Sequence, residues 1–281
     1  MGIYIAAAIT FVSAALIWGP VILAKQSKGE KKFLLILIAL TLPMSLLLYD
    51  FVRMPLQKLT AELFRNSRLP VILATLWAPL TEEPGKLWPL LLPFVRQRLH
   101  SDNLVRSALA LGLGFGMGEV VMLAIKISAS KQPALAWYMY GGFLGERIVV
   151  CFIHGGLTAI ALKQWGQRTF IWGILGAMVL HFLLNIPIFI FGMNQNFGLE
   201  KAVVQVILSF YIVFFFLAML GITAYLQFGT ANAGQLLFDY ATCPKCGKQF
   251  HRSIWALNLG WHRYERCPHC KKWSLIRLKQ S

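Results

Sequence analysis

Charged residues are scarce in this sequence. Only 14% of the 281 residues are Asp, Glu, Lys or Arg, and 57% are hydrophobic, whereas a typical soluble protein has about 25% charged residues. Helices with so little charge cannot present polar faces to water, so a soluble helical protein is excluded as the main interpretation. The first hydrophobic run lacks the basic start and the small-residue cleavage motif of a signal peptide. It is therefore predicted to remain as a membrane span.

Acidic residues are the scarcest charged type, with 11 Asp and Glu against 27 Lys and Arg, a formal net charge of +16. In a membrane protein this excess indicates basic cytoplasmic loops, and apolar runs repeatedly reach the roughly 20 residues that cross a bilayer. We predict an all-α polytopic membrane bundle, embedded in a lipid bilayer, followed by a small C-terminal domain. The seven predicted spans are Ile3–Ala24, Phe33–Val52, Leu69–Val95, Leu104–Ile127, Ala134–Leu162, Phe170–Phe191 and Ala202–Phe228.

The distribution of positive charge predicts an orientation. The loop Lys25–Lys32, the loop containing Arg96 and Arg98, and the basic tail share one side if the N-terminus is outside and the tail is cytoplasmic. The segment Arg53–Arg68 is also basic and would then lie outside. We predict this orientation in a bacterial cell membrane.

The chain changes character after Phe228. A Gly- and Ala-rich stretch predicts a linker, which divides the chain into a membrane domain over residues 1–228, a linker over 229–241 and a tail domain over 242–281. The tail carries two Cys-x-x-Cys motifs separated by 20 residues, a spacing that can supply four thiolates to one structural Zn²⁺. The predicted ligands are Cys243, Cys246, Cys267 and Cys270. Disulfides would need an oxidising compartment, which the predicted cytoplasmic location excludes.

This tail resembles a zinc ribbon. Its surface mixes many Lys and Arg residues with aromatic residues such as Trp255, Trp261, Tyr264 and Trp273. Such a surface can bind nucleic acid or anionic lipid headgroups. It can equally bind a regulatory protein or serve as a scaffold that needs metal to fold. We favour a partner-binding or regulatory role.

Ionisable residues inside predicted spans indicate function, because burying them in a membrane is costly. The third span contains the sequence TEEPGK over Thr81–Lys86, in which Glu82 and Glu83 lie four and three residues before Lys86, respectively. Helical geometry predicts that Lys86 projects between the two acids, leaving one carboxylate available as a base. A structural ion pair in a helix kinked by Pro84 is the alternative.

The fourth span combines glycines with one acid. Gly112/Gly116 and Gly114/Gly118 have the spacing that lets neighbouring helices approach closely. Glu119 follows at once and is predicted to point towards the acids of the third span or towards water.

The next two spans supply histidines. In the fifth, Arg147 and His154 share a face, and Arg147 is a plausible counter-ion for an acid on another helix, whereas the adjacent Glu146 is not expected to face it. His154 is predicted nearer the cytoplasmic end, where helix packing is an equally good explanation. In the sixth span His181 and Asn185 lie one turn apart near the middle, so His181 is expected in one layer with the acids.

The usual signatures of soluble hydrolases are missing. The sequence contains no HExxH motif, no GxSxG motif and no pair of aspartates within the spans. A buried carboxylate can nonetheless deprotonate water, a histidine can hold the water or a metal, and an asparagine can stabilise an oxyanion. These groups together predict a site for amide hydrolysis.

These motifs resemble those of the PrsW-type intramembrane proteases, within the wider group of CAAX prenyl proteases and bacteriocin-processing enzymes. Residues 82–86 are similar to the EExxK motif, Phe115–Glu119 to FxxxE, and His181–Asn185 to the HxxxN or HxxxD motif. Val120 departs from the Asn that usually follows the second motif, and the zinc ribbon lies outside the family core. The resemblance implies cleavage of membrane-embedded substrates, such as anti-sigma factors, with Glu82, Glu83 and His181 as the central catalytic residues.

Two mechanisms and two other functions stay open. The site can activate water through Glu82 or Glu83, or hold a catalytic metal with these acids, Glu119 and His181; no small-molecule cofactor is expected. The full predicted set of catalytic residues is Glu82, Glu83, Lys86, Glu119, His154, His181 and Asn185. The alternatives to a protease are a scaffold or immunity protein, in which polar residues hold helices together, and a proton-coupled transporter.

Overall fold

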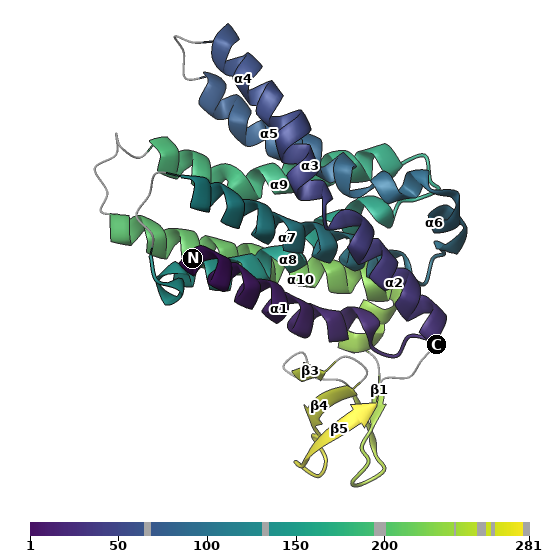
Figure 1. Ribbon diagram of the computed structural model, residues 1–281. Coiled ribbons are helices and arrows are strands. Elements are labelled where there is room, and N and C mark those ends of the chain that lie inside the picture. Colours follow the sequence, from purple (N-terminus) through teal and green to yellow (C-terminus); the bar gives the residue numbers. More distant parts are fainter. Residues whose placement is uncertain are drawn as a thin grey trace. The chain divides into compact units, whose positions relative to one another are not determined.

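The computed structural model describes residues 1–64, 69–130, 135–193, 201–238, 240–251, 257–259 and 262–277 (Figure 1). The chain divides into two compact units, Met1–Thr223 and Ala224–Ser281. The first unit is helical, and the second contains all the strands.

The helices of the first unit follow the predicted hydrophobic runs. In chain order they are α1 (Gly2–Leu23), α2 (Lys28–Thr41), α3 (Met44–Leu48), the π-helix η1 (Tyr49–Arg53), α4 (Met54–Leu63), α5 (Leu69–Lys86), the 3₁₀-helix η2 (Trp88–Leu91), α6 (Pro93–Arg98), α7 (Leu104–Ala129), the 3₁₀-helix η3 (Trp137–Tyr140), α8 (Gly141–Leu162), α9 (Phe170–Met193) and α10 (Lys201–Phe238). Helix α10 begins in the first unit and continues into the second.

Six helical stretches among the described residues are long and apolar enough to cross a membrane. They are Gly2–Leu23, Lys28–Leu63, Leu104–Ala129, Phe143–Leu162, Phe170–Pro187 and Val206–Phe228. Large apolar side chains remain exposed on their surfaces, for example Leu16 on α1 and Phe210 and Phe214 on α10. Water-soluble monomers rarely expose apolar surface of this extent. The chain therefore has the character of a membrane protein.

The third predicted span, Leu69–Val95, is not a single helix. Helix α5 ends at Lys86, and the short helices η2 and α6 follow. Pro89 explains the break, because it lacks the backbone N–H that would continue the helical ladder beyond Lys86. This segment is absent from the six membrane-capable stretches, so the count of seven spans stays a prediction.

Helix α7 is the centre of the first unit, and its glycines let two neighbours approach. A Cβ atom on Gly112 would overlap the backbone of His154 and Gly155, and one on Gly116 would lie 2.8 Å from the Cα atom of Cys151. Both contacts are with α8. On the other stripe, a Cβ on Gly114 or Gly118 would meet backbone oxygens of residues 38 and 42, at α2 and its end. The close approach of neighbouring helices is confirmed. The structure adds that the two GxxxG spacings contact two different helices.

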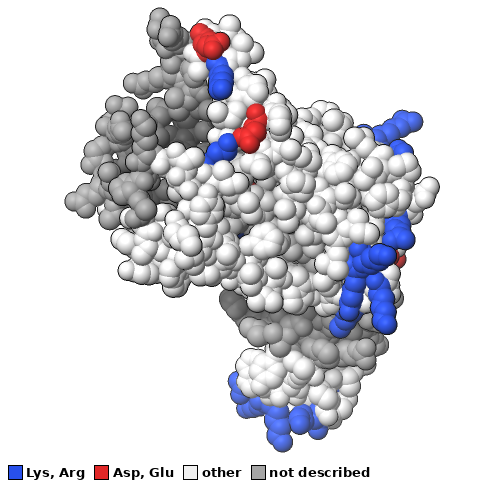
Figure 2. All heavy atoms as spheres, viewed as in Figure 1, with Lys and Arg blue, Asp and Glu red and all other residues white. Residues whose placement is uncertain are grey.

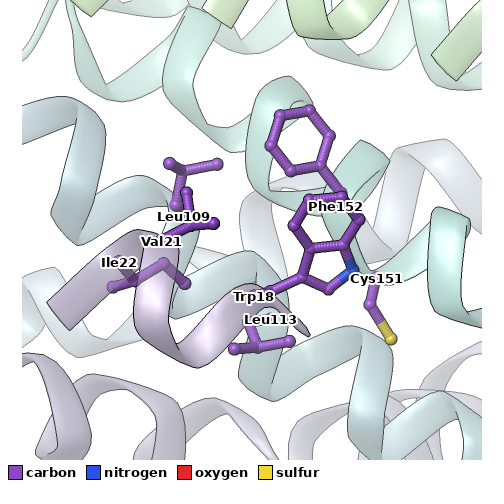
Figure 3. A pocket seen from close by; sticks show the side chains of 7 residues that line it. All are labelled: Trp18, Val21, Ile22, Leu109, Leu113, Cys151 and Phe152. Carbon is purple, nitrogen blue, oxygen red and sulfur yellow. The ribbon is translucent and has the colours of Figure 1, made fainter. Parts of the chain in front are cut away.

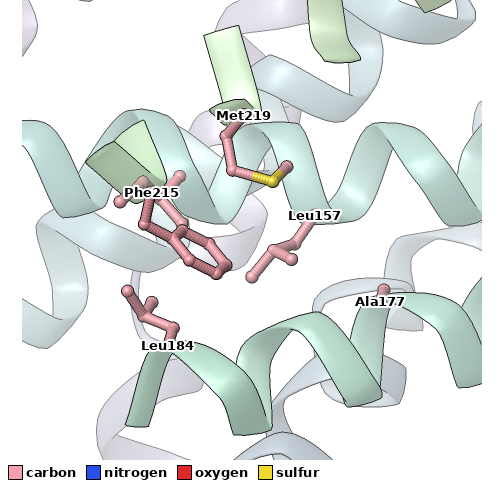
Figure 4. Close-up of a cluster of buried hydrophobic side chains, with 6 residues drawn as sticks. Leu157, Ala177, Leu184, Phe215 and Met219 are labelled. Atoms are coloured by element: carbon pink, nitrogen blue, oxygen red, sulfur yellow. The ribbon is translucent and has the colours of Figure 1, made fainter. Parts of the chain in front are cut away.

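An apolar cluster joins α8, α9 and α10 (Figure 4). Its buried members are Ile153, Leu157, Ala177, Leu184, Phe215 and Met219. Because α8 and α9 also carry the histidines, this packing fixes the mutual position of the two histidine-bearing helices.

Basic side chains gather at one end of the helical unit. Figure 2 shows Lys and Arg over the region where α2 begins and where α6 lies. The Arg98 guanidinium lies over the ring of Phe33 of α2, with 5.9 Å to the ring centroid, and this contact joins the two segments. The exposed basic residues there are Lys25, Lys28, Lys31, Lys32, Arg96 and Arg98. The predicted outside segment Arg53–Arg68 is largely helical: Arg53 ends η1, α4 follows, and residues 65–68 lie outside the described residues.

The second unit contains two small antiparallel sheets. Strands β1 (Tyr240–Thr242) and β2 (Gln249–His251) form one hairpin. Strands β3 (Leu257–Leu259), β4 (His262–Arg266) and β5 (Trp273–Arg277) form the other sheet in that order. The segment predicted as a linker, 229–241, is helical as far as Phe238, since α10 continues through Gly229 and ends at Phe238. The prediction of a non-helical linker is therefore wrong for residues 229–238.

Candidate functional site

Four helices bring acidic and histidine side chains together inside the first unit. Glu82 and Glu83 lie near the end of α5, Glu119 on α7, His154 on α8 and His181 on α9. The two glutamates of α5 and both histidines are buried, and only 1% of the His154 surface is exposed. Burial of this many ionisable groups requires partners for their charges.

Glu83 is bound by two side chains. Its Oε1 atom accepts a hydrogen bond from Lys86 Nζ at 2.6 Å and lies 2.5 Å from His181 Nδ1. The Lys86 side chain is fully buried and also lies over the ring of Phe115, 5.2 Å from its centroid. Glu83 therefore neutralises a buried lysine and orients the His181 ring.

Glu82 has a different cation. Arg53, the last residue of η1, donates from Nη1 to Glu82 Oε1 at 3.1 Å. The prediction that Lys86 lies between both acids is thus wrong, because Lys86 forms its ion pair with Glu83 alone among the described residues. The other Glu82 oxygen, Oε2, is buried, has no hydrogen-bond partner among the described residues and lies 3.8 Å from His181 Nε2.

Sequence reasoning assigned Arg53 to a loop and so missed its role. The signal was its position at the end of an apolar run, one residue after Val52. The π-helical turn η1 carries it, and such turns are frequent at functional sites.

Glu119 contacts two side chains of α8, Arg147 and His154. Arg147 Nη1 donates to Glu119 Oε2 at 3.2 Å, and His154 Nε2 lies 3.1 Å from the same oxygen. Arg147 is thus the counter-ion of an acid on another helix, as its position predicts. It also pairs with the neighbouring Glu146, which the sequence analysis did not expect. The Arg147 side chain is long enough to reach both Glu119 and Glu146, although adjacent residues such as Glu146 and Arg147 start from different faces of the helix.

His154 belongs to the buried cluster. Its ring centroid lies 5.6 Å from that of His181 in an edge-to-face arrangement, and 5.3 Å from that of Phe115. The prediction that His154 lies nearer the cytoplasmic end than the other polar groups is therefore wrong, since it contacts both Glu119 and His181. The predicted span began at Ala134, whereas α8 begins only at Gly141, which moves His154 towards the middle of the helix.

Three side chains present ligand atoms to a common point. One ligand atom each from Glu82, His154 and His181 lies within 4.8 Å of the other two. His154 Nδ1, like Glu82 Oε2, is buried and has no hydrogen bond to the part of the chain that the structure describes. Asn185 lies one turn after His181 and is half-buried, and it has no hydrogen bond to the described residues.

A small apolar recess lies elsewhere on the first unit (Figure 3). It is lined by Trp18, Val21, Ile22, Leu109, Leu113, Cys151 and Phe152. The Trp18 indole donates from Nε1 to the Ile148 carbonyl oxygen at 2.8 Å. Because the recess contains none of the predicted catalytic residues, it is a packing feature between α1, α7 and α8.

The four tail cysteines lie close together. Cys243 Sγ is 3.7 Å from Cys270 Sγ, Cys246 Sγ is 3.8 Å from Cys267 Sγ, and all four sulfurs lie within 4.8 Å of one another. This donor set can hold one tetrahedral Zn²⁺.

The two cysteine turns have the same backbone geometry. Cys243 N–H donates to the Lys248 carbonyl and Cys267 N–H to the Lys272 carbonyl, both at 3.0 Å. The residue after each motif, Gly247 or Lys271, has positive φ, a conformation that glycine adopts without strain. Burial opposes ionisation of the Cys243 thiol, but N–H donation from Lys245 and Cys246 prevails and lowers its pKa to about 6. A thiolate at neutral pH is the form that binds metal.

Comparison with known proteins adds no identification. No family model, curated protein or solved structure matches this chain. Function must therefore be argued from the residues of the site.

The buried cluster combines the groups that water activation requires. It contains a carboxylate oxygen without a hydrogen bond to the described residues and two imidazoles that each face a carboxylate with one nitrogen. Arg53, Lys86 and Arg147 lie beside the carboxylates. A water molecule or a cation can bind between Glu82, His154 and His181, because each presents a polar atom to the same point.

Proposed function

We propose that this protein is an intramembrane endopeptidase that hydrolyses peptide bonds of membrane-anchored proteins. The observation that carries the proposal is the buried Oε2 atom of Glu82, which has no hydrogen bond to the described residues and lies 3.8 Å from His181 Nε2. An unpaired carboxylate oxygen inside an apolar helical unit is costly to keep. Such a cost is typical of a functional group.

Glu82 is the proposed general base. Water adds to the carbonyl carbon of the substrate while one of its protons passes to Glu82, and the carbonyl oxygen becomes an oxyanion. The carbon–nitrogen bond then breaks, the proton moves to the leaving nitrogen, and a carboxylic acid and an amine result. Glu83 is less suited to accept the proton, because Lys86 and His181 both bind its Oε1.

The other residues of the cluster have supporting roles in this proposal. His181 holds the water, while Glu83 orients the His181 ring. Asn185, which has no hydrogen bond to the described residues, offers an amide donor for the oxyanion on the same helix face as His181. Arg53 donates to the other oxygen of Glu82, Oε1, at 3.1 Å and so places a positive charge beside this carboxyl group.

The class of substrate comes from the resemblance to PrsW-type proteases, which favours single-span regulators such as anti-sigma factors. We also propose a bacterial cell membrane, with the basic end of the helical unit and the zinc ribbon in the cytoplasm. Protease digestion of intact cells and of inverted vesicles tests this topology: the ribbon should be cut only in the inverted vesicles.

Reconstituted protein tests the activity on a library of single-span substrates. We expect Glu82→Gln to lower the cleavage rate by about 100-fold or more, the usual contribution of a general base. Glu62→Gln is the matched control, because Glu62 is an exposed acid of α4 outside the cluster. If folded Glu82→Gln and His181→Ala proteins cleave as fast as the parent, the proposal is wrong. Loss of stability without any substrate accumulating would favour a scaffold instead.

A further inference from the structure

Among the acidic and histidine side chains of the buried cluster, two polar atoms have no hydrogen-bond partner in the described residues. They are Glu82 Oε2 and His154 Nδ1. The remaining polar atoms of the same side chains have partners, since Arg53 binds Glu82 Oε1 and Glu119 binds His154 Nε2. Buried polar atoms nearly always have a partner, which indicates that another species binds here.

The unsatisfied atoms belong to a set of metal-ligand type. Glu82, His154 and His181 each offer one ligand atom, and these atoms lie within 4.8 Å of one another. Two imidazoles and one carboxylate form the ligand set of several catalytic zinc sites, which leave the fourth position open for water. The separation of 3.8 Å between Glu82 Oε2 and His181 Nε2 is close to that of two ligands on one ion, which is about 3.3 Å in tetrahedral geometry.

Each histidine is also held by a second carboxylate. Glu83 binds His181 at Nδ1 and Glu119 binds His154 at Nε2, at 2.5 Å and 3.1 Å. In metal-binding histidines, the ring nitrogen that does not bind the ion almost always donates to a carboxylate, a carbonyl or water. This contact fixes the tautomer and directs the other nitrogen to the ion. The nitrogens left over are His181 Nε2, which lies 3.8 Å from Glu82 Oε2, and His154 Nδ1, which has no hydrogen-bond partner among the described residues.

The charge of the cluster also favours a cation. Its ion pairs contain four carboxylates, from Glu82, Glu83, Glu119 and Glu146, but only three basic residues, Arg53, Lys86 and Arg147. With both imidazoles neutral, one negative charge remains inside an apolar unit. A divalent ion carrying a hydroxide would cancel it, and so would one proton on a histidine.

We propose that Glu82, His154 and His181 bind one divalent cation of the zinc type within the membrane unit, oriented by Glu83 and Glu119. This site is separate from the four tail cysteines. Binding itself does not depend on the proposed peptidase activity; only the use of the ion to activate water rests on that function.

Metal content of the full chain in detergent tests the inference. The double variant Cys267→Ser/Cys270→Ser removes the tail site, so any stoichiometric zinc that stays after incubation with Zn²⁺ and dialysis must bind elsewhere. We expect one zinc per chain in this background, and none after the further change His154→Asn. The matched control is His100→Gln, an exposed histidine outside the cluster, which should keep the zinc. Gel filtration and tryptophan fluorescence report whether each variant is folded.

A graded effect distinguishes orientation from ligation. Glu119→Gln keeps all three ligands but weakens the support of His154, so zinc affinity should fall by about 10- to 100-fold. The inference is overturned if the folded double variant holds no zinc, or if its zinc is indifferent to His154→Asn. Should the double variant fail to fold, the parent must hold two zinc ions and His154→Asn one.

Cleavage is measured on the same samples, so the two proposals can fail separately. Zinc bound at the cluster without cleavage would refute the peptidase but not the site. Cleavage by protein without zinc at the cluster would refute the site but not the peptidase.

Discussion

Replacing Lys86 by methionine should destabilise the membrane unit strongly. The Lys86 side chain is fully buried, and its ammonium group is 2.6 Å from Glu83 Oε1. Methionine fills a similar volume but removes the charge, so Glu83 keeps only the contact with His181. Breaking a buried ion pair costs about 3–5 kcal/mol, because the remaining charge stays out of water without its partner. We expect a loss of this size in the free energy of unfolding.

A double-mutant cycle shows whether unpaired charge is the cause. Glu83→Gln alone should cost about as much as Lys86→Met, because it leaves the ammonium unpaired. Together the two changes leave neither charge, so the double variant should be no less stable than the worse single variant. Unfolding in mixed detergent micelles, followed by the fluorescence of the nine tryptophans, gives these free energies.

The control for this cycle is Lys31→Met. Lys31 is an exposed lysine near the start of α2, and surface changes of this kind stay within about 0.5 kcal/mol. The reasoning is refuted if Lys86→Met costs less than about 1 kcal/mol, or if the double variant loses the sum of the two single effects.

Two further predictions concern helix packing and the tail. Gly112→Ala places a methyl group against the backbone of Gly155, so stability should fall by about 1–3 kcal/mol; Gly19→Ala, where nothing lies within 4 Å, should be neutral or stabilising by up to about 1 kcal/mol. Thermal unfolding compares them, and equal effects would contradict close packing of α7 on α8. Cys243→Ser should remove one zinc per chain without changing cleavage by the cluster; metal analysis that finds unchanged zinc would exclude the cysteine site.

The sequence alone determines the class of the protein and the position of its ionisable residues. Long apolar runs exclude water as the surroundings of most helices, and the helical period decides which side chains share a face. The pairs Arg147 with His154, and Phe115 with Glu119, could be placed this way, since both depend only on residues within one helix. The four cysteines could also be grouped from the sequence, because two Cys-x-x-Cys motifs at this separation are typical of one zinc site.

Only the tertiary structure decides which residues of different helices meet. Glu82 and Glu83 both lie about one helical turn before Lys86, yet Glu82 pairs with Arg53, which a π-helical turn from a distant segment brings within 3.1 Å. His154 joins the cluster because glycines on α7 let α8 approach closely, and because α8 starts later than its apolar run suggests. Helical periodicity shows which side chains share a face of one helix. It does not show where the helix starts or which other helix packs against that face, and contacts between helices depend on both of these.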